Sequence, residues 1–137
     1  MMLWPRRSVL CLAVLVIAAA AWAAHANEAF PFGSELMLDT PPMHGSKRVP
    51  MIEIEDDGTA VLDLWCASAK AQAIVGDATI TIVPGVVLPP AQPCEPERQA
   101  RDADLLTALA QVTGWRRHGD LVELSGPAAL RFHLMTN

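Results

Sequence analysis

Residues 51–66 read MIEIEDDGTAVLDLWC, a stretch with the pattern of a β-hairpin. Isoleucine and glutamate alternate over 52–55, which is the two-residue period of a strand with one buried face. Asp57-Gly58 comes next, and this dipeptide strongly favours the tight turn of a hairpin. The returning strand is expected over Thr59–Cys66, with Trp65 on its outer face. Its core face is expected to carry Ala60, Leu62, Leu64 and Cys66.

Short strands are also expected on both sides of this hairpin, because turn residues recur at the spacing of an antiparallel sheet. They are Ser34–Asp39, Ala71–Val75, Ala78–Val83, a strand opening at Trp115, Leu121–Ser125 and Ala128–Leu134. Pro84-Gly85 is expected to end one of them. The three prolines of 86–93 favour an edge strand or a loop there and exclude a central strand.

One amphipathic helix is expected in the second half of the chain. Leu105, Leu109 and Val112 recur at i, i+4 and i+7, the spacing of one helix face. The helix is expected to begin between Pro96 and Asp102 and to be ended by Thr113-Gly114. Short hairpin-spaced strands with one helix predict an α+β fold, namely a curled antiparallel β-sheet or cracked β-barrel with one packed α-helix.

The composition limits the classes of function. The chain has 137 residues, which suits one domain and excludes a multidomain enzyme. It carries 15 acidic and 10 basic side chains, for a net charge of -5, and has no basic run. Nucleic-acid binding depends on neutralising phosphates with clustered lysine and arginine, so a nucleic-acid partner is not expected.

The first 26 residues have the anatomy of a secretory signal peptide. Arg6-Arg7 precede an apolar run over 9–20, and Ala24-His25-Ala26 supplies small residues for cleavage near Ala26. The run is shorter than the roughly 20 residues that span a bilayer, so membrane contact is expected only through an uncleaved segment. A domain at 27–137 is therefore expected in the periplasm or outside the cell, by general secretion or a twin-arginine route.

Removal of the leader leaves two cysteines, Cys66 and Cys94. Oxidising compartments favour pairing of such thiols, so a structural disulfide is expected. Two buried free thiols or a metal pair are the alternatives, and the histidines show no metal-ligand spacing around the cysteines. Neither a metal nor another cofactor is expected.

Candidate catalytic groups have simpler explanations. The acid pairs Glu53/Glu55 and Asp102/Asp104 are interpreted as solvated faces of a strand and a helix, so no catalytic residue is assigned. Trp65 is a candidate partner contact, because tryptophan is enriched at interfaces, although core packing is its commoner role. The basic loop with His44, Lys47 and Arg48 is a candidate contact for an anionic partner, the alternative being solvated charges.

The order of these features resembles the META (HslJ-like) family over about 35–134. The resemblance rests on the hairpin leading to Cys94, the acidic helix, Trp115, the run Gly119-Asp120-Leu121-Val122-Glu123-Leu124, the last strand Leu130-Arg131-Phe132, and upstream Gly58 with the strand to Cys66. The chain has Trp65-Cys66-Ala67 where the family usually has Gly-Cys-Asn, and Gln92-Pro93-Cys94 where it often has Met-Ala-Cys. Both family cysteine positions remain occupied, which adds support for the disulfide.

The resemblance implies a non-enzymatic envelope module, linked in relatives to heat shock, other stress responses, drug tolerance or secretion, without catalytic residues or cofactor. A binding or envelope-maintenance role, with an unknown envelope protein as partner, is the leading hypothesis. A periplasmic hydrolase inhibitor, acting against a lysozyme or protease, is a second hypothesis, with the loop Thr40–Pro50 as its inserting segment. A carrier of a small apolar ligand inside the barrel is a third.

Overall fold

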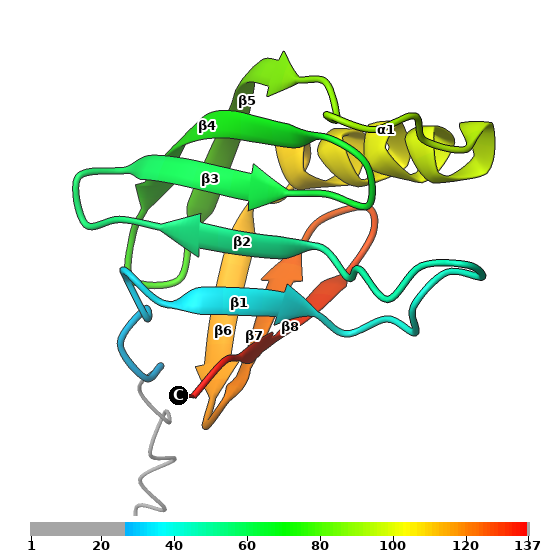
Figure 1. Cartoon of the computed structure of the whole chain (residues 1–137). Coiled ribbons are helices and arrows are strands. Elements are labelled where there is room, and N and C mark those ends of the chain that lie inside the picture. Colours follow the sequence, from blue (N-terminus) through cyan, green and yellow to red (C-terminus); the bar gives the residue numbers. More distant parts are fainter. Residues whose placement is uncertain (1–26, 137) are drawn as a thin grey trace, which may run out of the picture.

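The computed structural model describes residues 27–136, and the expected signal peptide lies outside them. These residues form eight strands and one helix (Figure 1). In chain order they are β1 (Glu35–Leu38), β2 (Met51–Ile54), β3 (Thr59–Asp63), β4 (Ser68–Val75), β5 (Ile80–Leu88), α1 (Pro96–Ala110), β6 (Gly114–His118), β7 (Leu121–Ser125) and β8 (Leu130–Leu134). No helix in this described part is both long and apolar enough to cross a membrane.

All eight strands belong to one antiparallel sheet in the order β5-β4-β3-β2-β1-β8-β7-β6. Pairing of β1 with β8 joins the two halves of the chain, with Leu36 opposite Leu134. The sheet curls until its edge strands approach each other, and Thr79 forms an isolated bridge with Gly114. The curled antiparallel sheet with one helix is thus confirmed, and its edges meet over a short stretch only.

The predicted first hairpin is confirmed in its turn and in the residues that face the core. Ile52 lies opposite Leu62 in the β2–β3 pair, and both side chains face the core. Gly58 has a φ of +87°, and a Cβ there would lie 2.5 Å from the Ala73 carbonyl oxygen. A glycine is therefore required by both the backbone conformation and the contact with β4.

The inner face of the sheet is filled by side chains that are almost completely buried. The largest of them are Phe132, Leu36, Ile52, Ile54, Leu62, Leu64, Ile80 and Ile82. Leu105 and Leu109 of α1 join the same cluster, as the helical periodicity predicts. The interior of the barrel is thus a packed core.

Two predicted strand ends were wrong. β3 ends at Asp63, because the chain turns over 64–67 and Leu64 donates a backbone hydrogen bond to the Ala67 carbonyl. β5 continues through Pro84-Gly85 to Leu88, because the β4–β5 register shifts between Ala69 and Ala71. A bulge on an edge strand accommodates a proline, which has no N–H to donate.

Gly114 has a different role from the helix stop predicted for it. The helix already ends at Ala110, capped by Gln111. Gly114 begins β6, where a Cβ would lie 2.6 Å from Ser125 Oγ and 3.3 Å from the Ala78 carbonyl oxygen. The absence of a side chain lets the two sheet edges come together.

Candidate functional site

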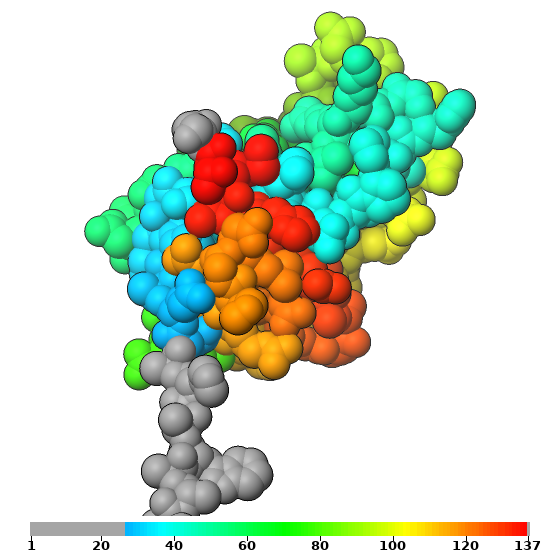
Figure 2. All heavy atoms as spheres, turned by 90° about the horizontal axis from the view of Figure 1, so that it is seen from below, coloured from blue at the N-terminus to red at the C-terminus, as the bar shows by residue number. Residues whose placement is uncertain are grey.

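Three connections gather at one end of the barrel, termed here the loop end (Figure 1). They are the β1–β2 connection (39–50), the β3–β4 turn (64–67) and the β5–α1 segment (89–95). Figure 2 shows the first of these, in cyan, standing out from the body of the molecule. A pocket of about 530 Å³ lies among the connections and the first turn of α1.

A buried carboxylate of α1 organises the 64–67 turn. Asp102 is only 6% exposed, and its two oxygens accept hydrogen bonds from three successive backbone amides. The donors are Trp65 N at 2.8 Å, Cys66 N at 3.1 Å and Ala67 N at 2.9 Å. The prediction of a solvated Asp102 was therefore wrong. Burial of a carboxylate is tolerated here because several N–H groups converge on it.

The disulfide ties the same turn to the same helix. Cys66 in the turn is bonded to Cys94, two residues before α1, with their Cα atoms 5.9 Å apart. The expected disulfide is thereby confirmed in the structure. Together with the Asp102 contacts it gives the loop end two separate attachments between turn and helix.

The pocket at the loop end is lined by basic and hydroxyl side chains and by an apolar wall. Its charged lining residues are Arg48 and Arg98, and no acidic residue of the described chain lines it. Leu88 and the prolines of 89–93 form the apolar wall. Within residues 27–136, two buried side-chain nitrogens have no hydrogen-bond partner, Trp65 Nε1 and Arg98 Nε. Both residues line this pocket, and Trp65 also lines a neighbouring pocket of about 390 Å³ together with Asp104 and Leu105.

The structure brings together two of the four predicted contact residues. Trp65 and Arg48 line the pocket, and Arg48 also forms an ion pair with Asp63 at 3.6 Å. Trp65 is 7% exposed, so it forms a wall of the pocket and not a projecting anchor. His44 and Lys47 are exposed on the projecting connection and do not line the pocket.

Sequence reasoning missed Arg98 and the role of Asp102. A signal was present, because 98, 102, 105 and 109 follow the three- and four-residue spacing of one helix face. The helix face that carries Leu105 and Leu109 also carries Asp102 and Arg98 nearer the start of the helix. A carboxylate and a guanidinium therefore lie on the face that packs against the barrel. Polar residues on such a buried face indicate either a hydrogen-bonded contact within the protein or a binding site.

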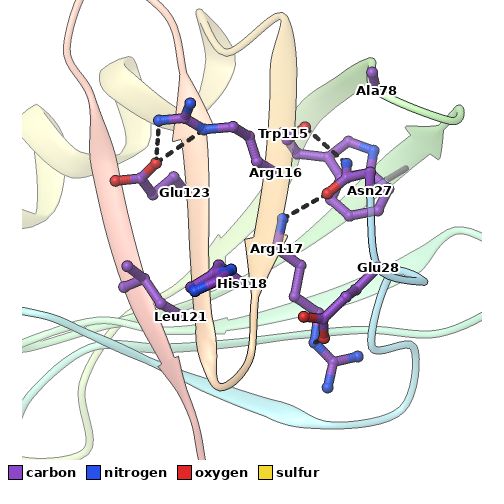
Figure 3. A pocket seen from close by; sticks show the side chains of 9 residues that line it. All are labelled: Asn27, Glu28, Ala78, Trp115, Arg116, Arg117, His118, Leu121 and Glu123. Carbon is purple, nitrogen blue, oxygen red and sulfur yellow. Dashed lines mark hydrogen bonds and ion pairs between the residues drawn. The ribbon is translucent and has the colours of Figure 1, made fainter. Parts of the chain in front are cut away.

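A second pocket, of about 800 Å³, lies beside β6 at the gap between the sheet edges (Figure 3). Asn27 sits in this gap and bonds to both sides of it. Its Nδ2 donates to the carbonyls of Trp115 at 3.2 Å and Asp77 at 3.4 Å, and its Oδ1 accepts from Arg117 N at 2.8 Å. The side-chain amide thus satisfies backbone groups on the free edge of β6, as a neighbouring strand would.

We expect Asn27→Ala to lower the free energy of unfolding by about 2 kcal/mol, because two or three hydrogen bonds to the edge of the barrel are lost. Urea denaturation of the purified protein measures the change. The neighbouring Glu28→Gln variant is the control, since its ion pair with Arg117 is exposed and contributes about 1 kcal/mol or less. Equal stability of Asn27→Ala and Glu28→Gln would contradict the proposed sealing role of Asn27.

The acid pair Glu53/Glu55 lies on the outer face of the first hairpin. The pKa of Glu55 is raised from its ordinary value of 4.5, chiefly by a hydrogen bond with Glu53 and also by the repulsion of nearby carboxylates. The pKa of Asp57 is lowered from 3.8, because its Oδ1 accepts hydrogen bonds from the Thr59 hydroxyl and the Thr59 amide.

We expect the Glu53→Gln variant to bring the pKa of Glu55 back toward 4.5 and to leave that of Asp57 unchanged. Because the folded chain holds the Glu55 proton more tightly, this residue's contribution to stability declines as the pH rises from 4.5 through its folded pKa. Asp57 acts in the opposite sense, and its contribution is lost as the pH falls below 3.8. Carboxyl-carbon NMR titration measures both. An unchanged Glu55 pKa in the variant would exclude Glu53 as the cause.

Comparison with known proteins finds structures of similar fold and does not identify a function. No known family profile matches the chain, and no curated protein matches it. An NMR structure of a protein has a TM-score of 0.54 at 14% identity, covering 74% of this chain and 89% of its own. An NMR structure of a protein from Burkholderia xenovorans has a TM-score of 0.57 at 15% identity, covering 77% of this chain and 84% of its own. At these identities the likeness concerns the fold alone.

Proposed function

We propose that this protein is an exported, non-catalytic binding protein of the cell envelope, of the META (HslJ-like) type, and that it binds through the loop end. The observation that carries the proposal is the pocket there, with two buried N–H donors that lack partners among residues 27–136. Native proteins leave few buried polar groups unpaired, and such groups indicate a missing water, ion or ligand.

Two further features support export and binding. The Cys66–Cys94 disulfide is typical of proteins that fold in an oxidising compartment, which agrees with the signal-peptide pattern at 1–26. The disulfide and the Asp102 contacts also hold the turn and helix at the pocket in a fixed arrangement, and a preorganised site loses less entropy on binding.

The alternative of an internal carrier for an apolar ligand receives no support from the interior. Phe132, Leu36 and Ile52 fill the centre of the barrel and are each 2% exposed or less. A lipid-sized ligand would have to displace this packed core.

The alternative of a hydrolase inhibitor is favoured by one observation, the projecting 39–50 connection in Figure 2. Retention on immobilised lysozymes or envelope proteases, lost on shortening this connection, would support that alternative.

The proposed function is tested in cells that make the protein naturally. Intact mass of the envelope fraction is expected to show a chain beginning at Asn27. A photo-crosslinking amino acid replacing Lys47 at the loop end is expected to give a defined crosslinked product. The same amino acid replacing Asp56, an exposed turn residue at the opposite end of the barrel, is the matched control.

Two outcomes would contradict the proposal. One is a full-length chain retained in the cytosol with both cysteines reduced, which would remove the basis for an envelope role. The other is the same crosslinking pattern from Lys47 and Asp56, because a specific interface at the loop end requires that only the first position react.

A further inference from the structure

We propose that the loop-end pocket binds a small organic carboxylate, with the carboxylate at Arg98 and Trp65 and the apolar body of the ligand against the proline-rich wall. This inference rests on the proposed binding role of the loop end and adds the class of ligand. It follows from the charge, the unpaired donors and the shape of the pocket.

The unpaired donors are the first argument. Trp65 is nine-tenths buried and lines the pocket, yet its Nε1–H has no acceptor among the described residues. Arg98 Nε–H is buried at the same pocket and is equally unpaired within residues 27–136. A buried donor without an acceptor is destabilising, so two such donors in residues that line one pocket call for an acceptor there.

The second argument is the sign of the charge. The chain as a whole is acidic, with 15 acidic side chains against 10 basic, yet this pocket is lined by Arg48 and Arg98 without an acid. No ion pair involves Arg98 in the described part of the chain, so its charge is available to a ligand. Arginine recognises carboxylates through paired N–H donors in a fixed fork.

The start of α1 lies next to the pocket, which Cys94 and Arg98 line. The helix begins at Pro96, and its N-cap residue, Glu95, makes no side-chain capping hydrogen bond. The first amides of a helix lack partners within the helix and carry a partial positive charge. Arg98 lies in this first turn and lines the pocket, whereas Pro96 and Glu97 do not.

The apolar wall distinguishes an organic acid from a bare inorganic anion. Leu88 is 46% exposed at the pocket, and Pro89, Pro90 and Pro93 continue this surface. An apolar group packed against it would be removed from water, which favours binding. A carboxylate with an apolar body can bind the N–H donors and also pack against the apolar wall, whereas phosphate can bind only the N–H donors.

The test is an NMR titration of the purified protein, with its disulfide formed, using benzoate, acetate and inorganic phosphate as probes. Trp65 and Trp115 provide two indole N–H signals, and that of Trp115 is an internal control because it already donates to the Gly76 carbonyl at 2.8 Å. We expect benzoate to move the Trp65 signal with a dissociation constant of about 1 mM and to leave Trp115 unmoved. Acetate and phosphate should bind at least tenfold more weakly.

Variants locate the binding. Arg98→Gln should weaken benzoate binding at least tenfold, and Arg98→Lys should retain part of it. Arg116→Gln is the matched control, because Arg116 lies on the outer face of β6 and pairs with Glu123. Arg48→Gln keeps the test decisive if the Arg98 variants do not fold. The Arg48 side chain is exposed, so its replacement should leave the fold intact, and this variant should weaken benzoate binding severalfold.

The outcomes separate this inference from the proposed function. If none of the three anions moves the Trp65 signal, or if phosphate binds as well as benzoate, the carboxylate site is overturned. Crosslinking from Lys47 would then still support a binding role of the loop end. If benzoate binds but the protein is not exported, the carboxylate site stands and the envelope role is overturned.

Discussion

Replacement of Asp102 by asparagine is expected to lower the free energy of unfolding by about 3 kcal/mol, and replacement by alanine by about 4 kcal/mol. Three backbone amides of the 64–67 turn donate to the two Asp102 oxygens in a buried position. Asparagine has the same shape but replaces one acceptor oxygen by an NH₂ donor, which then faces N–H groups. Alanine leaves all three amides without an acceptor.

Urea denaturation with the disulfide intact measures this loss. Asp104→Asn is the matched control, because it makes the same change of charge two positions along the same helix at an exposed residue. Its effect should stay within about 0.5 kcal/mol. If Asp102→Asn and Asp104→Asn unfold at the same urea concentration, the Asp102 contacts contribute nothing and the explanation of the turn given above fails.

Removal of the disulfide is expected to lower the free energy of unfolding by about 3.5 kcal/mol, because the bond closes a loop of 28 positions in the unfolded chain. In the chain beginning at Asn27, the double variant Cys66→Ala/Cys94→Ala leaves no free thiol and is the variant of choice. Wild-type protein in excess reductant should match it, and reductant should not change the stability of the variant. An unchanged midpoint for reduced wild-type protein would contradict a stabilising role.

The disulfide and Asp102 should also be coupled energetically, since both attach the 64–67 turn to α1. Combining Asp102→Asn with the double cysteine variant should give a total loss that departs from the sum of the two by about 1 kcal/mol. Simple additivity would mean that each attachment acts on its own.

The local elements of this fold are predictable from short stretches of sequence. The alternation over 52–55 and the Asp57-Gly58 turn predict the first hairpin, because strand faces and tight turns depend on residues near each other in the chain. The spacing of Leu105 and Leu109 predicts the buried face of α1 for the same reason. Two cysteines downstream of a signal-peptide pattern predict their own pairing.

The predictions failed where distant segments compete for the same backbone groups. Thr59–Cys66 continues the alternation of a strand, yet the last residues leave the sheet, where Asp102 accepts hydrogen bonds from the amides of Trp65 and Cys66. The two-residue alternation contains no information about an acceptor such as Asp102, which lies 36 positions after Cys66. Similarly, Pro84-Gly85 has the composition of a strand end, and only the bulge opposite Ala69 and Ala71 explains why β5 continues.

Local periodicity and composition are enough to predict most of each strand, the helix, the sign of the charge and the pair of cysteines. Tertiary structure alone decided that β1 pairs with β8, that Gly114 lies where the sheet edges meet, and that Arg98 and Trp65 share a pocket. These contacts join residues far apart in the chain. Their positions follow from how the curled sheet packs around its core, and no short stretch of sequence contains that information.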